Sequence, residues 1–188
     1  AESTQAKPQF PPEAADYLIA VKDLPQSDPH DVRYIKSFAL GIAVASRGAD
    51  HLRNRPTLDI LRLPDDVRMK IFGVETSADP TAYEGKAGMV AWHDDIYAVT
   101  DCLGICKFVT HGFNSPHLLG YGHFTDLVKA ATGLEFTEDE LRAVGRRVID
   151  LERQINLEFG VGYNMGADSP SGRLQMIDLH RVWLDKAA

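Results

Sequence analysis

Apolar side chains recur at helical spacing near the beginning of the chain. Between residues 27 and 48, the apolar positions fall on one side of a helix with 3.6 residues per turn; they are Val32, Ile35, Phe38, Ala39, Ile42 and Ala43. Pro29 suits the first turn of such a helix, and Gly48 suits its C-terminal end. The pattern predicts a helix over residues 27–48, whose small residues around Gly41 let a neighbouring backbone approach closely.

Two later apolar segments end at glycines. Residues 63–73 predict a short helix that ends at Gly73, and residues 121–134 predict a helix that Gly133 closes. Residues 177–188 have the pattern of a further short helix.

Capping boxes mark the starts of two long helices. Thr81 and Glu84 have the required spacing, and so do Thr137 and Glu140. The first helix extends to Gly104 and can direct one set of side chains to a core: Tyr83, Ala87, Val90, Tyr97 and Val99. The second carries one apolar stripe: Leu141, Val144, Val148, Leu151 and Ile155.

The order of these elements predicts the fold class. Helix follows helix without a convincing run of alternating strands, although residues 12–25 are ambiguous between a short strand and a helical turn. We therefore expect an all-α fold, an irregular domain of five to seven helices. Residues 1–24 are predicted to be an extended lead-in and residues 25–188 a single helical domain, with long connections around 53–64, 107–117 and 160–176.

Composition narrows the possible classes of protein. The 188 residues are 44% hydrophobic and 25% charged, as in ordinary globular domains. A net charge of −7 argues against a nucleic-acid partner, because phosphates would repel this surface. No apolar run approaches the roughly 18–20 residues that span a bilayer. Two cysteines do not make a disulfide framework, which favours the cytoplasm.

Both cysteines lie at the predicted end of the helix that leads to Gly104. Asp101 offers carboxylate acceptors to a flat N–H edge, Gly104 lets a flat ligand approach the backbone, and Cys106 offers a thiolate to a metal or cluster. The alternative is structural: a solvated Asp101, a helix-ending Gly104, and two cysteines buried as hydrophobic side chains. A zinc site with His111 and His117 and a disulfide between the cysteines are weaker alternatives, because structural zinc ligands are usually spaced differently.

Other candidate residues are weaker on their own. His51 stands among charges after a glycine, where an imidazole can act as a proton donor or acceptor, or be an exposed loop residue. His93 is expected at the surface of its helix. Glu152 and Arg153 are expected to form a structural ion pair rather than a ligand clamp.

Together these segments resemble the C-terminal part of the tungsten-containing aldehyde:ferredoxin oxidoreductase family. The resemblance covers about residues 25–160 and is carried by a predicted helix and the three segments that follow it, in the family's order. They are "SRGADHLR" (46–53), "YEGKAGMVAWHDDIYAVTDCLGICKF" (83–108) and "TGLEFTEDELRAVGRRVIDLERQIN" (132–156).

The resemblance implies a fold, cofactors and site residues. Members hold a tungsten (or molybdenum) bis-pterin cofactor and a 4Fe–4S cluster between an N-terminal β domain and two helical domains, and this chain resembles the last domain. It implies that Asp101 binds the pterin edge, that Leu103, Gly104 and Ile105 line the pterin, and that Cys106 is the fourth cluster ligand. His51 would assist proton transfer, and Cys102 is assigned to packing.

The resemblance also implies partners. The family's C-x-x-C-x-x-x-C run and first pterin motif do not occur here, so we expect this chain to be an excised domain or a truncated gene product. Its partners would be the missing N-terminal domains, a ferredoxin-like electron acceptor and a small aldehyde substrate. We expect the isolated chain to be inactive and without a bound cluster.

Two alternative functions remain at the level of sequence. The segment between His51 and Tyr83, together with "FNSPHLLGY" (113–121), resembles tungsten subunits of class II benzoyl-CoA reductases, which act on an aromatic acyl substrate. A cofactor-free helical module that binds a partner subunit would have the same packing pattern.

Overall fold

The computed structural model describes residues 20–21, 24–25, 34–110 and 117–159. Five α-helices make up most of this part: α2 (Lys36–Val44), α3 (Asp65–Phe72), α4 (Lys86–Leu103), α5 (Tyr121–Thr132) and α6 (Glu138–Glu158). Short 3₁₀ helices η3 (Thr57–Asp59) and η4 (Lys107–Val109) lie in the connections. This confirms the predicted all-α class.

A small ribbon precedes the helices. Strands β1 (Ala20–Val21) and β2 (Leu24–Pro25) pair antiparallel, with Val21 opposite Leu24. The ambiguous segment 12–25 therefore contains extended backbone where it is described. The proposed helix over 177–188 and the connection over 160–176 lie outside the described residues.

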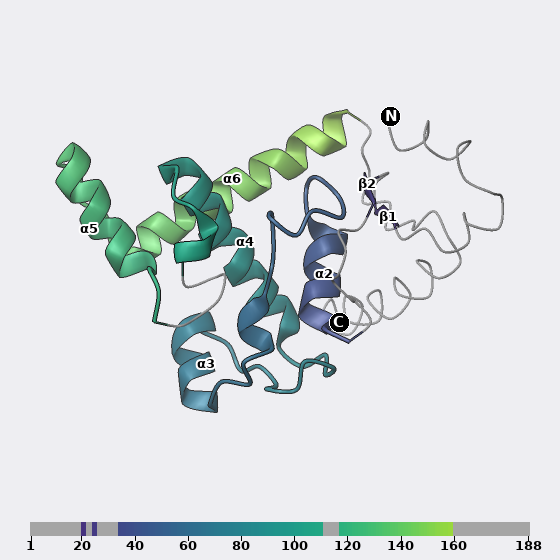
Figure 1. The fold of residues 1–188 in the computed structure, drawn as a ribbon. Helices are drawn as coiled ribbons and strands as arrows, with labels where there is room; N and C mark the ends of the chain where they lie inside the picture. The colour runs from purple at the N-terminus through teal and green to yellow at the C-terminus, as the bar shows by residue number, and fades with distance from the viewer. Residues whose placement is uncertain (1–19, 22–23, 26–33, 111–116, 160–188) are drawn as a thin grey trace.

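Helix α4 is the centre of the fold. It packs against α2 on one side and the long α6 on another, while α3 lies beside it and α5 packs on α6 (Figure 1). Twelve of its 18 residues are buried, which is the pattern of a helix covered nearly all round. No helix in the described ranges has the length and apolar character to cross a membrane.

The core has two parts, both of which include α4. One lies against α2 and comprises Phe38, Ala39, Leu40, Ile42, Ala43, Ala49 and Val90. The other lies towards α3, α5 and α6 and comprises Leu58, Phe72, Met89, Trp92, Ile96, Tyr97, Val99, Tyr121, Phe124 and Leu141. Because side chains of α4 point into both parts, the helix is fixed in position along its length.

The glycine stops of α3 and α5 were predicted correctly. Gly73 and Gly133 have φ angles of 70° and 76°, and each donates its N–H to the last turn of the helix before it. The end of α2 was predicted too late. Its last residue is Val44, four residues before the predicted end at Gly48, because Ala45 leaves the helical region with ψ at 138°.

The predicted capping box at the start of α4 is wrong. Thr81 instead donates its N–H and hydroxyl to Asp79 Oδ1, both at 2.8 Å. The helix begins after Gly85, whose φ of 73° suits glycine, and a Cβ there would lie 2.1 Å from the Glu75 carbonyl oxygen. The close approach of this second backbone segment sets the start of the helix. The second box is confirmed, since Thr137 and Glu140 cap α6 reciprocally.

The predicted stripe of α6 is only partly confirmed. Leu141 is buried, but Leu151 and Ile155 are exposed, and the buried series continues through Gly145 and Ile149. A Cβ at Gly145 would lie 2.2 Å from the Asp95 carbonyl oxygen of α4. The closeness of the two backbones at that glycine selects the face of α6 that meets α4.

Candidate functional site

The end of α4 is a sharp turn built by one glycine. Gly104 has a φ of 66°, and its N–H and that of Ile105 donate to the Asp101 and Thr100 carbonyl oxygens at 3.2 and 2.9 Å. A Cβ at Gly104 would meet no atom within 4 Å, so the space beside this backbone is open. The turn leaves Cys106 in extended conformation just beyond the helix.

The carboxylate of Asp101 is held by two cations. Arg53 Nη1 donates to Oδ2 at 2.7 Å, and Lys107 Nζ donates to Oδ1. Lys107 is itself fixed by the Tyr97 ring, whose centroid lies 5.4 Å from Nζ. The Asp101 side chain is nevertheless 43% exposed. A carboxylate has about four lone-pair positions, so Asp101 can still accept hydrogen bonds from a ligand.

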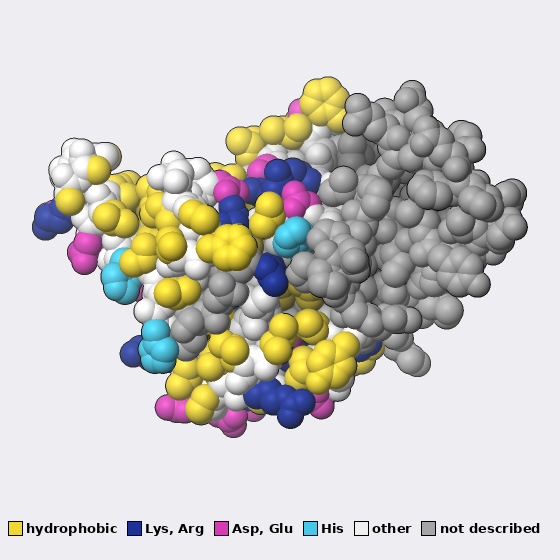
Figure 2. Space-filling view, in the orientation of Figure 1, with side chains coloured by type: hydrophobic (Ala, Val, Ile, Leu, Met, Phe, Trp, Pro, Cys, Tyr) yellow, Lys and Arg dark blue, Asp and Glu magenta, His cyan; other side chains and the backbone are white. Residues whose placement is uncertain are grey.

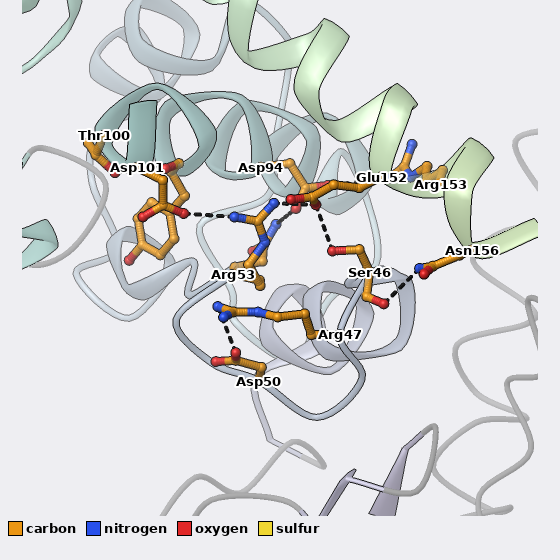
Figure 3. A network of polar contacts seen from close by, with 12 residues as sticks. Ser46, Arg47, Asp50, Arg53, Asp94, Thr100, Asp101, Glu152, Arg153 and Asn156 are labelled. Carbon is orange, nitrogen blue, oxygen red and sulfur yellow. Dashed lines mark hydrogen bonds and ion pairs between the residues drawn. The ribbon is translucent and has the colours of Figure 1, made fainter. Parts of the chain in front are cut away.

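Arg53 connects this end of α4 to α6. Its guanidinium lies between Asp101 and Glu152, and Nη2 donates to Glu152 Oε2 (Figure 3). Glu152 also accepts from the Ser46 hydroxyl at 2.7 Å, and Asn156 Nδ2 donates to the Ser46 carbonyl oxygen at 2.8 Å. The Arg53 side chain is only 7% exposed. The loop after α2, the end of α4 and α6 therefore share one polar network.

His51 lies on the loop between α2 and η3. This loop is stabilised locally, because Asp50 pairs with Arg47 at 2.7 Å and accepts the Leu52 N–H at 2.8 Å. His51 is partly buried and stands two residues before Arg53. Since Arg53 reaches Asp101, the segment that carries His51 adjoins the end of α4. Arg53 thus joins the loop that carries His51 to the end of α4 that carries Asp101.

Both cysteines are exposed free thiols. This contradicts the interpretation of the pair as buried hydrophobic side chains, and it also contradicts the assignment of Cys102 to packing. The reason is that the last turn of α4 is covered on one side only: Leu103 and Ile105 pack against the second part of the core, whereas Cys102 and Cys106 are exposed. The surface around them also carries apolar side chains, since Phe108 is 60% and Val109 is 45% exposed. Figure 2 shows apolar and charged side chains next to one another on one face.

The metal alternatives differ in what they require. A four-ligand zinc site would need His111, which lies outside the described residues. Within the part of the chain that is described, no three His, Cys, Asp or Glu side chains gather closely enough to hold a metal ion. A cluster ligand contributed to a site shared with other protein segments requires only one exposed thiol, and Cys106 fits that requirement.

The middle of α4 buries a second set of polar side chains. His93 is fully buried, against the surface position predicted for it, and its Nδ1 donates to the Met89 carbonyl oxygen at 2.8 Å. The cause is the cover on several sides of α4, which leaves no solvent face at this turn. Asp95 pairs with Arg142 and Arg146 of α6.

Asp94 is the most strongly perturbed carboxyl group of this set. Asn54 Nδ2 donates to its Oδ1 at 2.6 Å, and Arg153 Nη2 donates to its Oδ2 at 3.4 Å. Burial outweighs these favourable contacts and raises the pKa of Asp94 to about 6. Glu152 and Arg153 thus take part in structural ion pairs, as predicted, but with Arg53 and Asp94 rather than with each other.

Sequence reasoning missed the two cations that hold Asp101. Arg53 was only one of the unnamed charges around His51, and Lys107 was not singled out. The position of Lys107, six residues after Asp101 and beyond the turn at Gly104, was the available local signal. Nothing local indicated the contact of Arg53, which spans 48 residues of sequence.

Comparison with known proteins gives a consistent result. The family described as "Aldehyde ferredoxin oxidoreductase, domains 2 & 3" matches residues 3–177. Among the similar curated proteins are tungsten-containing aldehyde ferredoxin oxidoreductases from Pyrococcus horikoshii, 31% identical over 149 residues, and Pyrococcus furiosus, 30% identical over 140 residues. The enzyme of the same name from Thermococcus kodakarensis is 28% identical over 149 residues.

The matched regions differ greatly in how much of each protein they cover. They include 78%, 74% and 78% of this chain, but 21%, 20% and 22% of those three relatives. The chain therefore spans about a fifth of the length of the curated relatives it matches. It belongs to the aldehyde ferredoxin oxidoreductase family and corresponds to a part of its domains 2 and 3.

Proposed function

We propose that this chain is the pterin- and cluster-binding helical part of a tungsten (or molybdenum) aldehyde oxidoreductase. The observation that carries the proposal is the end of α4, where an oriented carboxylate, an open glycine and an exposed thiol occur within six residues, Asp101 to Cys106. The relatives are named as tungsten-containing enzymes, and this donor set suits a flat heterocycle beside a metal centre.

The residues at this site would hold the cofactors in distinct ways. Asp101 would accept hydrogen bonds from the N–H edge of a pterin, because two of its lone-pair positions remain available. Leu103, Gly104 and Ile105 would line the flat ring, and the absence of a Cβ at Gly104 leaves room for it. Cys106 would supply one thiolate to a 4Fe–4S cluster whose other ligands come from another part of the enzyme.

His51 would move a proton during the reaction. Oxidation of an aldehyde with water to a carboxylic acid releases two protons and two electrons, so a group that accepts protons near the substrate is needed. The bound metal and cluster would supply the redox chemistry and pass the electrons singly to a ferredoxin-like acceptor. The loop network around Asp50 and Arg53 orients the segment that carries His51.

An aldehyde is the proposed substrate because the relatives carry that activity in their names. The benzoyl-CoA reductase-like alternative predicts the opposite direction of electron flow, from a reduced ferredoxin-like donor to an aromatic acyl thioester. Both activities can be assayed on the full-length protein with the same redox dye. Aldehyde-dependent dye reduction supports the proposal, and its absence together with thioester-dependent dye oxidation contradicts it.

The two cysteines provide a matched test of the cluster assignment. Cys106→Ser and Cys102→Ser each remove one exposed thiol from the same turn of the chain. In the full-length protein, we expect Cys106→Ser to abolish or strongly alter the iron–sulfur absorbance and Cys102→Ser to leave it unchanged. An unchanged spectrum in Cys106→Ser would show that the ligand assignment is wrong.

A further inference from the structure

Arg53 is a buried cation that joins three segments of the chain. It follows the loop that carries His51, and its guanidinium reaches Asp101 at the end of α4 and Glu152 on α6 (Figure 3). The neighbouring Asn54 anchors the same loop to the middle of α4, donating to the Val90 carbonyl oxygen at 2.9 Å and to Asp94. The loop is therefore fixed at two consecutive residues.

We infer that Arg53 is a positioning residue, which holds Asp101 in the orientation that meets the pterin and fixes the His51 loop beside Asp101. This inference rests on the proposed function. It assigns Arg53 no contact with cofactor or substrate, since both of its Nη groups are engaged with carboxylates of the chain. Its effect on the cofactor would pass through Asp101 alone.

The chemistry of the guanidinium explains why an arginine stands here. Its planar fork presents donors in fixed directions, so one side chain can hold carboxylates from two different helices. Lys107 also contacts Asp101, but its ammonium is a compact point charge with rotatable donors, so it imposes no fixed direction on the carboxylate. Arg53 thus sets the orientation of the Asp101 carboxylate, whereas Lys107 mainly balances its charge.

The competing interpretation is that Arg53 only joins helices as a structural ion pair. The two interpretations differ in a double-mutant cycle, because residues that act through one another give non-additive effects. The cycle compares the full-length wild type with Arg53→Ala, Asp101→Ala and the double variant. The readouts are tungsten per polypeptide after gel filtration and the tungsten EPR signal, neither of which depends on turnover.

We expect each single variant to lower tungsten retention by about ten-fold, the lower end of the range for residues that orient metal-site groups. The double variant should retain as much tungsten as Asp101→Ala alone. Arg47→Ala is the matched control, because Arg47 lies on the same loop, is exposed and pairs with Asp50 rather than with Asp101 or Glu152. It should leave retention and the EPR signal unchanged.

Glu152→Gln separates orientation from folding. It weakens the side of the network that faces α6 and leaves the Arg53–Asp101 contact intact. We expect it to lower thermal stability while tungsten retention stays within about two-fold of wild type, as for other single substitutions away from the cofactor. This variant keeps the test informative if Arg53→Ala does not fold.

Each outcome of the cycle decides the inference. A double variant whose loss is the product of the two single losses overturns it, as does Arg53→Ala with the tungsten content and EPR signal of wild type. In both cases the wild type holds tungsten, so the proposed function stands. A wild type that holds neither tungsten nor molybdenum overturns the proposed function and this inference together.

Discussion

The body of α4, residues 86–100, and the turn at its end, residues 101–106, use polar residues in opposite ways. In the body, Lys86, Asp94 and Asp95 are buried, and each is paired with side chains of this chain. At the end, Asp101 and both cysteines are exposed. One helix therefore contains polar groups that stabilise the fold and polar groups left available to a ligand.

The difference follows from what covers each turn. Helices α2 and α6 cover the body, so an unpaired charge there would carry the full penalty of desolvation. After Thr100 no residue of the helix is fully buried, and the space beside the Gly104 backbone is open. Burial raises the pKa of Asp94 and Asp95 in the body, as expected for carboxylates in a dry environment. The comparison predicts large effects on folding from changes in the body and small ones from changes at the end.

The largest effect should come from breaking the buried pair of Lys86 and Asp59. Both side chains are 1% exposed, and Asp59 also accepts from the Ser37 hydroxyl at 2.6 Å. Lys86→Met would leave Asp59 without its cation, at a cost of about 3–5 kcal/mol in the free energy of unfolding. Urea denaturation of this chain measures the change.

The matched control for that experiment is Lys129→Met. Lys129 pairs with Glu135 at 2.6 Å, but both side chains are largely exposed, so the change should stay below about 1 kcal/mol. Equal losses in the two variants would contradict the distinction between buried and exposed charges.

The next effect is a pH dependence caused by Asp94. Its pKa is raised from 3.8 to about 6 in the folded chain, so between about pH 4 and 6 the folded state binds more protons than the unfolded state. This group therefore favours folding most below pH 4, and its contribution is lost as the pH rises to 6. At about 1.4 kcal/mol for each pKa unit, the loss is about 2–3 kcal/mol.

The effect is measured as a difference between variants, because other carboxyl groups titrate in the same range. Stability of the wild type minus that of Asp94→Asn should fall as the pH rises from 4 to 6 and stay flat above pH 7. Asp150→Asn, at an exposed position of α6, gives the background. A difference curve for Asp94→Asn that is flat or rises across the window would contradict the burial argument.

The third effect tests the close contact of α4 and α6. Gly145→Ala would place a Cβ 2.2 Å from the Asp95 carbonyl oxygen, and backbone cannot move aside cheaply. We expect a loss of about 1–3 kcal/mol, measured by thermal unfolding. Gly122→Ala is the control, because its Cβ would meet only the flexible end of the Glu138 side chain, with Oε1 at 3.2 Å and Cδ at 3.9 Å. Similar effects of the two substitutions would refute the proposed role of Gly145.

The sequence allowed prediction of those elements that local signals determine. Gly73, Gly133 and the Thr137–Glu140 box end or begin helices through contacts within a few residues, and all were predicted correctly. The start of α4 was not, because it depends on the backbone near Glu75 meeting Gly85. The contact face of α6 depends in the same way on the approach of another helix.

In the candidate site, too, features within a short stretch of sequence could be predicted, whereas contacts between distant residues could not. Asp101, Gly104 and Cys106 are close in sequence, so their presence at one helix end could be predicted. The burial of His93 could not, because an amphipathic pattern does not reveal that both sides of its helix are covered. The contact between Arg53 and Asp101 joins residues 48 positions apart, and no periodicity contains that information.

The smallest effect on folding should come from the cysteines. Cys102 and Cys106 lie outside the core, so replacing either with serine should change the free energy of unfolding by less than about 0.5 kcal/mol. Their exposure also predicts that both thiols of the native chain react with iodoacetamide at rates within about ten-fold of the denatured chain, since access limits neither. Mass spectrometry after timed labelling distinguishes the two sites. Slow labelling of Cys102 alone would show that this side chain is packed, and the exposed end of α4 would then begin after it. Equal labelling of the two cysteines places the start of the exposed end before Asp101.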